Sequence, residues 1–219
     1  MTNTVCLISG ANRGIGRGLV EALLSRPNTT IIAAVRNPNV AASHIITLKT
    51  RYNITHIDVV IANAGISNNY SPIHSVSPDG VREHFDVNFY GPLHLFQAVY
   101  PLLKKSSKPT FVGVGSAMGT IGGMEQRPFP NAAYGLSQAM LHWMVRKIHF
   151  ENEGFISFIS DPGWAQTDMS DFAVQALGAP PPLHTVPEIV EGMVRTIDGA
   201  TRESVGGQWC VWDGSRFPW

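Results

Sequence analysis

The chain has 219 residues, of which 44% are hydrophobic and 15% charged, and its 16 basic residues balance its 16 acidic ones. This composition is typical of a globular protein and excludes a disordered or membrane-spanning chain. Without a basic cluster, we expect neither nucleic acid nor a membrane surface as a partner. The N-terminus lacks the layout of a signal peptide, and Cys6 and Cys210 lie in strand-like runs. We therefore expect a cytoplasmic protein with two reduced thiols.

The first predicted elements are a buried strand over 5–8, a turn containing Gly10, Gly14 and Gly16, and a helix that ends before Pro27. In this arrangement the glycines let bare backbone approach a pyrophosphate, and the positive end of the helix favours the phosphate charge. Glycine-rich turns also follow strands in many other α/β proteins. The stretch alone therefore leaves nucleotide binding undecided.

Strand-like and helical runs then alternate along the chain. The predicted strands cover 30–36, 57–65, 110–115, 155–160 and 208–212, and the predicted helices cover 78–103, 132–152 and 187–198. This alternation predicts an α/β fold with a doubly wound parallel sheet, the Rossmann fold, in a single domain over 1–219. A Pro-rich segment within 164–187 is predicted to form a substrate loop or lid.

One interval is too short for the complete fold. Between Arg36 and Ile57 there are twenty residues, whereas a helix, a strand and a second helix need roughly 30. The third strand of the Rossmann order lies at the sheet edge, so its loss leaves the central strands paired. We predict that this edge strand is missing or truncated. A single helix over 41–52 is favoured over a short strand at 45–48.

Two arginines flank the predicted nucleotide site. Arg13 lies in the glycine turn, and Arg36 ends the second strand, where an adenine ribose would lie. An acidic residue at the latter place favours NAD, whereas arginine accommodates a 2′-phosphate. The pair therefore predicts NADP(H) as the cofactor. The alternative is that both arginines are merely exposed charges.

Polar residues follow three of the later predicted elements. The run Asn63-Ala64-Gly65 ends a strand at the edge where open sheets bind ligands. Ser116 follows another strand, and Tyr134 and Gln138 share one face of the next helix. Carbonyl reduction needs a proton donor at the oxygen and a second hydrogen bond to polarise it, and tyrosine and serine hydroxyls supply these.

Together these motifs resemble the short-chain dehydrogenase/reductase family. The resemblance rests on five features: the spacing G-x-x-x-G-x-G from Gly10, the N-A-G run, Asn88, the pair Ser116 and Tyr134, and the loop Pro162-Gly163-x-x-x-Thr167. The C-terminal half is similar to the norsolorinic acid ketoreductase-like subgroup, which is similar to enzymes of polyketide and other secondary-metabolite pathways. Residues Ser9 to the last strand are covered, which is nearly the whole chain.

The resemblance implies roles for individual residues. Tyr134 would donate the proton, Ser116 would polarise the carbonyl, and Asn88 would hold a proton-relay water. The implied catalytic residues are Ser116, Tyr134, Asn88 and Gln138. The implied cofactor-binding residues are Gly10, Asn12, Arg13, Gly14, Ile15, Gly16, Arg36, Asn63, Ala64, Gly65, Tyr134, Gln138, Pro162, Gly163, Ala165 and Thr167. No metal site is expected, because His142 and His149 have no third ligand placed with them. The family commonly forms homodimers or homotetramers through the helices at 78–103 and 132–152.

The chain departs from the family motif Tyr-x-x-x-Lys, because position 138 is glutamine. The lysine hydrogen-bonds the nicotinamide ribose and lowers the pKa of the tyrosine by its charge. A nearby cation shifts a pKa by about 1–3 units, so its loss should lower a proton-transfer-limited rate roughly ten- to a thousandfold.

Two hypotheses follow from this departure. One is an NADP(H)-dependent oxidoreductase that reduces a ketone, or oxidises an alcohol, of a hydrophobic metabolite such as a polyketide. The other is a non-redox isomerase, dehydratase or cyclase on the same fold, or a catalytically silent homologue.

Overall fold

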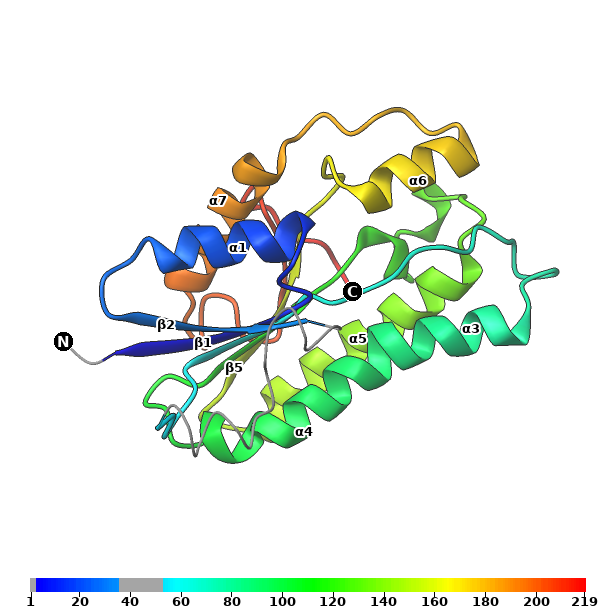
Figure 1. Ribbon diagram of the computed structural model, residues 1–219. Coiled ribbons are helices and arrows are strands. Elements are labelled where there is room, and N and C mark those ends of the chain that lie inside the picture. The colour runs from blue at the N-terminus through cyan, green and yellow to red at the C-terminus, as the bar shows by residue number, and fades with distance from the viewer. Residues whose placement is uncertain (1–2, 36–52) are drawn as a thin grey trace.

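The computed structural model describes residues 3–35 and 53–219 and contains a six-stranded parallel sheet (Figure 1). The strand order is β2-β1-β3-β4-β5-β6. The strands are β1 (Thr4–Ser9), β2 (Thr29–Ala34), β3 (Val59–Ala62), β4 (Thr110–Val114), β5 (Ile156–Asp161) and β6 (Trp209–Val211). This confirms the predicted α/β Rossmann class, and β2 is the last strand on its side of the described sheet. The helix predicted over 41–52 and the alternative strand at 45–48 lie outside the described residues.

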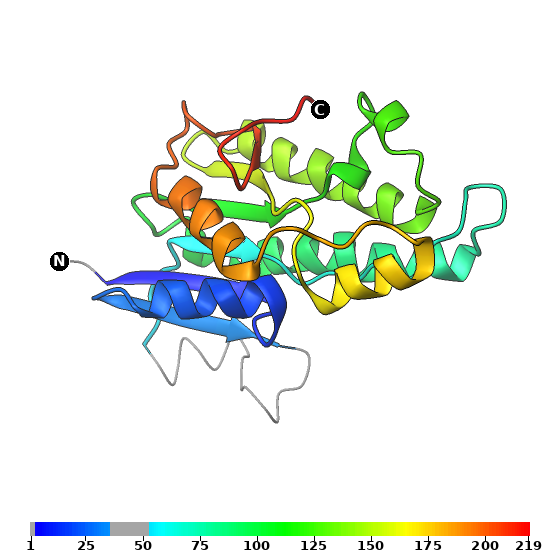
Figure 2. The same cartoon turned by 90° about the horizontal axis from the view of Figure 1, so that it is seen from above.

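Helices cover both faces of the sheet (Figures 1 and 2). One face carries α1 (Gly14–Leu24) and α7 (Val186–Asp198), and the other carries α3 (Pro78–Phe85), α4 (Gly91–Leu103) and α5 (Ala132–Glu151). Because both faces are covered, the strands are continuously apolar, and Ile8, Val60 and Phe111 are fully buried. None of the helices in the described ranges is long and apolar enough to cross a membrane.

The parallel register brings the carboxyl ends of the strands to one edge. Ser9 is paired with Ala34, Ala62 with Gly113, and Val114 with Ser160. The strand order reverses between β1 and β3, which is where open α/β sheets bind their ligands. The predicted site residues that follow β1, β3, β4 and β5 therefore gather along this edge.

The predicted helix over 78–103 has the predicted extent but contains a π-helical turn. Ser77 caps α3, with its hydroxyl accepting a hydrogen bond from the Gly80 amide, and the turn η1 (Asp86–Tyr90) separates α3 from α4. The Gly91 amide donates to the Asp86 carbonyl, five residues earlier. Such turns widen a helix locally and are frequent at functional sites. Asn88 lies in this one.

The segment 164–187, predicted to form a substrate loop or lid, contains a helix that the sequence analysis did not predict, α6 (Asp168–Leu177). Thr167 and Ser170 form a reciprocal capping box at its start, and Gly178 ends it in the left-handed conformation, with φ of 62°. The prolines at 180–182 follow this helix end. Figure 2 shows α6 beyond the carboxyl ends of the strands.

The glycine turn is packed too closely for a side chain at Gly16. A Cβ there would overlap the Gly10 carbonyl oxygen and contact the Asn63 amide nitrogen. We expect Gly16→Ala to lower the free energy of unfolding by about 1–3 kcal/mol, as overpacking a tight interior does. Urea denaturation measures this change. The control is Gly154→Ala, because a Cβ at Gly154 has nothing within 4 Å. Equal losses in the two variants would contradict the packing argument.

Candidate active site

Asn63 joins the glycine turn to the end of β3. Its side-chain nitrogen donates to the carbonyl oxygens of Ser9 at 2.9 Å and Gly10 at 3.2 Å. The Ser9 hydroxyl in turn accepts from the backbone amides of Asn63 and Ala64, both at 3.0 Å. The N-A-G run therefore fixes the position of the glycine turn by hydrogen bonds. Asn12 and Arg13 are exposed on the outer side of that turn.

The far side of the glycine turn contacts the start of α6. A Cβ on Gly14 would lie 3.6 Å from the Thr167 side chain. Arg13 forms an ion pair with Asp168, with 2.9 Å between guanidinium and carboxylate, and both side chains are exposed. An exposed pair of this kind contributes at most about 1 kcal/mol, so Arg13 can exchange its partner at little cost. Arg36 lies outside the described residues.

Ser116 and Tyr134 meet at the end of β4. Ser116 starts the short 3₁₀ turn η2 (Ala117–Gly119), and its hydroxyl accepts from the Met118 amide at 3.3 Å. Tyr134 lies in the first turn of α5 and is half-buried. Burial raises the pKa of Tyr134 to about 12, a hydrogen bond with the Ser116 side chain opposes that rise, and the charge of Asp161 adds to it. The structure thus brings these two predicted catalytic residues together.

Asn88 ties α5 to the loop after β3. Its nitrogen donates to the Ile66 carbonyl and to the Ser137 hydroxyl, both at 2.9 Å, and its oxygen accepts from the Ile66 amide at 2.8 Å. The Ser137 hydroxyl in turn donates a hydrogen bond to the Tyr134 carbonyl at 2.8 Å. Asn88 is 1% exposed, so this chain of bonds fixes the first turn of α5 from inside.

Gln138 lies one helical turn after Tyr134 and is 4% exposed. Its side-chain oxygen Oε1 is buried and has no hydrogen-bond partner among the described residues. A buried acceptor left unpaired costs about 1–3 kcal/mol. The glutamine therefore presents an unsatisfied acceptor in the helix that carries the tyrosine.

The loop after β5 completes the edge. The Gly163 amide donates to Asp161 at 2.8 Å, Gly163 has φ of 63°, and Thr167 caps α6. Pro162 is buried, whereas Gly163 is exposed. Ala165 is buried in the core on the side of α1 and α7, and the partly buried Ile15 packs against that core.

Comparison with known proteins decides the family. A family model described as short chain dehydrogenase matches residues 46–177. The chain is 40% identical to the norsolorinic acid ketoreductase nor1 of Dothistroma septosporum, with 99% of this chain and 92% of the relative covered. The norsolorinic acid ketoreductase of Aspergillus parasiticus is 37% identical over 99% of this chain and 91% of the relative. The chain belongs to the short chain dehydrogenase family.

The fold of this family member also agrees with a solved structure. An NADPH-bound carbonyl reductase from chicken fatty liver superimposes with a TM-score of 0.85 at 24% identity, over 100% of both chains. The alignment to the Dothistroma relative spans 248 positions, more than the 219 residues here. That relative therefore has residues within the aligned region that this chain lacks.

Gln138 replaces the lysine of the family motif, and the two cations later in the same helix do not compensate for it. Arg146 donates to the Gly207 carbonyl at 2.6 Å and lies over the Trp219 ring at 4.7 Å. Lys147 pairs with Glu151 at 3.2 Å. Tyr134 accordingly keeps its proton far above neutral pH.

This raised pKa predicts the pH dependence of alcohol oxidation. In the role that the family resemblance implies, Tyr134 must be ionised to accept the proton of the alcohol, and below a pKa of about 12 its ionised fraction rises tenfold for each pH unit. We expect the oxidation rate to rise about tenfold per unit from pH 7 to pH 10 without a plateau. Ketone reduction uses the protonated form and should not respond to Tyr134 over this range. A plateau in oxidation below pH 9 would contradict the assignment.

The sequence did not single out Asp161 and His142 as site residues. Asp161 is the one charged residue of the fully buried strand β5 (Ile156–Asp161), and this is the local signal for it. His142 was expected to be a surface or core histidine, and the structure buries it near Ser116. Among residues 3–35 and 53–219, no group of three His, Cys, Asp or Glu side chains is arranged to hold a metal ion.

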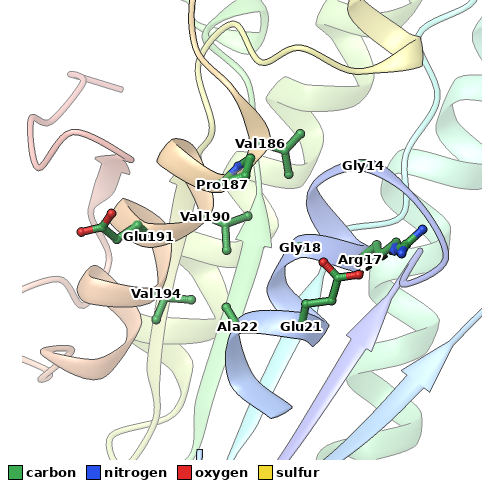
Figure 3. A pocket seen from close by; sticks show the side chains of 10 residues that line it. All are labelled: Gly14, Arg17, Gly18, Glu21, Ala22, Val186, Pro187, Val190, Glu191 and Val194. Atoms are coloured by element: carbon green, nitrogen blue, oxygen red, sulfur yellow. Dashed lines mark hydrogen bonds and ion pairs between the residues drawn. The ribbon is translucent and has the colours of Figure 1, made fainter. Parts of the chain in front are cut away.

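A separate apolar groove of about 600 Å³ lies between α1 and α7 (Figure 3). Val186, Val190 and Val194 line it from α7, and the Arg17–Glu21 ion pair borders it on α1. Its lining includes Gly14 but none of Ser116, Tyr134, Asn88 or Gln138. The groove is therefore distinct from the group of predicted catalytic residues at the strand ends.

Proposed function

We propose that the protein is an NADP(H)-dependent oxidoreductase that reduces a ketone, or oxidises the corresponding alcohol, of a hydrophobic small molecule of polyketide type. The observation that carries this proposal is the unpaired Oε1 of Gln138, buried one turn beyond Tyr134 and its hydrogen-bonded partner Ser116. An acceptor in this place fits a ribose hydroxyl. The names of the fungal relatives support a ketone substrate, and the solved carbonyl reductase supports NADPH.

The residues present fit a nicotinamide dinucleotide. The glycine turn offers bare backbone and the start of α1 to a pyrophosphate. Gln138 Oε1 would accept a hydrogen bond from the nicotinamide ribose, and the loop Pro162–Thr167 would border the nicotinamide. When bound, this cofactor supplies the hydride that adds to the carbonyl carbon.

The proton chemistry belongs to Tyr134 and Ser116. Ser116 would donate a hydrogen bond to the carbonyl oxygen and stabilise the negative charge that develops on it. Tyr134 would transfer its phenolic proton to that oxygen and regain one from solvent. The ketone thus gains a hydride at carbon and a proton at oxygen. Asn88 would act by holding the first turn of α5, through Ser137, at the distance that this transfer needs.

Apolar side chains around the loop after β5 suit a hydrophobic substrate. The side chains of Trp164, Met169 and Phe172 are 40%, 39% and 45% exposed. Tyr70, from the loop after β3, contacts Phe172 with ring centroids 5.8 Å apart. We assign 164–187 as the lid over the substrate, and these aromatic rings would face an aromatic or fused-ring ketone.

The preference for NADP(H) is predicted from Arg13 and Arg36, and it is tested by titrating the protein with NADPH and NADH and following the nicotinamide fluorescence. We expect tighter binding of NADPH. Arg13→Ala should weaken that preference, whereas Asp168→Asn frees Arg13 from its ion pair and should keep or strengthen it. Equal affinities of the wild type for both nucleotides would overturn the NADP(H) assignment.

Aromatic side chains on the outer surface support a homodimer or homotetramer. Trp143 and Phe150 on α5 are 67% and 61% exposed, and Tyr90, just before α4, is 43% exposed. Single apolar residues are common at surfaces, but Trp143 and Phe150 lie seven positions apart and therefore on one face of α5, and two exposed aromatic rings on one helix face favour an interface. By contrast, the aromatic C-terminus packs on its own chain, with Trp219 5.9 Å from Trp209 between ring centroids.

A non-redox reaction remains the second candidate function. The observation that favours it is the raised pKa of Tyr134 together with the absence of a lysine at 138. Protonated Tyr134 and Ser116 could then serve an isomerase, dehydratase or cyclase as acid groups. Hydride transfer separates the two candidates.

A further inference from the structure

Beneath Ser116 lies a histidine that the proposed reaction does not use. The Ser116 amide donates to His142 Nε2 at 3.3 Å, and His142 is 3% exposed. The approach depends on Gly115, because a Cβ there would lie 2.6 Å from the same nitrogen. Burial lowers the pKa of His142 to about 3, so the ring is neutral and its Nε2 accepts the bond from Ser116.

A buried carboxylate holds the two loops on either side of this histidine. Asp161 is 1% exposed and accepts from the Gly163 amide at 2.8 Å and from the Trp209 ring nitrogen at 3.2 Å. The Ala117 amide, next to Ser116, faces the same carboxyl group and helps to lower its pKa. The Trp209 ring lies against His142, with centroids 4.3 Å apart. One carboxylate thus joins the end of β4, the loop after β5 and the interior of β6.

We propose that His142, Trp209 and Asp161 form a buried brace that positions Ser116 and the Gly163 loop relative to Tyr134. The brace acts through other residues: His142 accepts from the Ser116 amide, and Asp161 accepts from the Gly163 amide and faces the Ala117 amide. The Trp209 ring packs on His142 and donates to Asp161. Its kinetic consequences rest on the reductase function proposed above, whereas its geometry does not.

The ionisation of Asp161 sets the strength of the brace. Burial raises the pKa of Asp161 to about 6, and the amide of Gly163, the ring nitrogen of Trp209 and the charge of Arg127 oppose this rise. The other titratable groups facing it are Tyr134 and His142 on α5. Hydrogen bonds to a carboxylate are stronger than those to a neutral carboxyl group, so the brace tightens as the pH rises through about 6.

The same shift lowers stability. Because the folded pKa lies above the ordinary value of 3.8, the contribution of Asp161 to stability is fully present below pH 3.8 and is lost as the pH rises through about 6. Ionisation of Asp161 thus strengthens the hydrogen bonds of the brace but lowers the free energy of unfolding. Melting temperatures measured from pH 4 to pH 8 should therefore fall in the wild type relative to Asp161→Asn.

Nuclear magnetic resonance of the protein without nucleotide tests the geometry directly. We expect the Trp209 ring N–H and the amides of Ala117 and Gly163 to shift together with pH, with one midpoint near 6. Asp161→Asn should remove this common titration, and Trp209→Phe assigns the ring signal. Three signals that do not share a midpoint, or a titration that persists in Asp161→Asn, would overturn the brace.

Kinetics then test its role in positioning. We expect Asp161→Asn to lower kcat for ketone reduction about tenfold with little change in KM, and to flatten a wild-type profile in which kcat falls below pH 6. His142→Gln, which keeps an acceptor, should retain more activity than His142→Leu. The matched control is Asp58→Asn, because Asp58 accepts from the Val5 amide and the Ser106 hydroxyl at the opposite end of the sheet.

The two proposals fail separately in these experiments. A wild type that reduces no ketone, but shows the common titration, contradicts the reductase and leaves the brace established. An active enzyme whose kcat and pH profile are the same in Asp161→Asn and Asp58→Asn contradicts the positioning role alone.

Discussion

Gln138→Lys is expected to raise kcat for ketone reduction about tenfold or more. The new ammonium group would lie one helical turn from Tyr134, where a cation lowers a pKa by about 1–3 units, or about 1.4 kcal/mol per unit. A lower pKa makes the phenol a better proton donor to the carbonyl oxygen. The buried Asp161 adds its negative charge to the same region, so the new cation would have a counter-charge.

Two companion variants separate the charge of the lysine from its hydrogen bond. Gln138→Met keeps the volume but removes the acceptor, and we expect it to weaken nucleotide binding without raising kcat. Gln138→Lys should also move the rise of alcohol oxidation to lower pH, since it lowers the pKa of Tyr134. If Gln138→Lys binds the nucleotide and shows neither a higher kcat nor this shift, Gln138 does not occupy the role assigned to it.

Tyr134→Phe is expected to lower kcat about 10²–10⁴-fold, the usual contribution of a general acid, which corresponds to about 3–5 kcal/mol in the barrier. The variant removes one phenolic oxygen and leaves the half-buried ring in place. Nucleotide binding, measured by nicotinamide fluorescence, should change much less than kcat.

Tyr100→Phe is the matched control for the loss of a phenol. Tyr100 lies on α4, and its hydroxyl donates to the Asn152 side chain at 3.1 Å, away from Ser116. We expect its kcat to equal that of the wild type. Comparable losses in the two tyrosine variants would show that the Tyr134 effect reflects folding rather than proton transfer.

The sheet could be predicted because its signals are local. Parallel strands covered on both faces are continuously apolar, so 110–115 and 155–160 stand out from the sequence alone. The helix α6 was not predicted, because the prolines at 180–182 favoured a loop over the whole segment 164–187. Its capping box at Thr167 and Ser170 and the closing Gly178 were the available signals.

The candidate site also contains residues that local sequence signals reveal and residues that they do not. The motifs predicted that Ser116 and Tyr134 lie close together, because one follows a strand and the other begins a helix, and the structure brings the two together with Gln138 one turn later on α5. The contact of His142 with Ser116 and that of Asp161 with Trp209 join residues 26 and 48 positions apart. Such contacts depend on the packing of whole elements, and periodicity does not reveal them. The prediction for Arg36 stays untested, because it lies outside the described residues.

Single-turnover transfer of a labelled hydride tests the proposed reductase most directly. The wild-type protein is mixed with NADPH carrying deuterium at the transferred position and with a hydrophobic aryl ketone, and the product is analysed by mass spectrometry and magnetic resonance. The account predicts one alcohol per NADPH oxidised, with the deuterium on the carbinol carbon. An isomerised or dehydrated product without deuterium, or bound NADPH that is never oxidised across a panel of such ketones, would contradict it and favour a non-redox function.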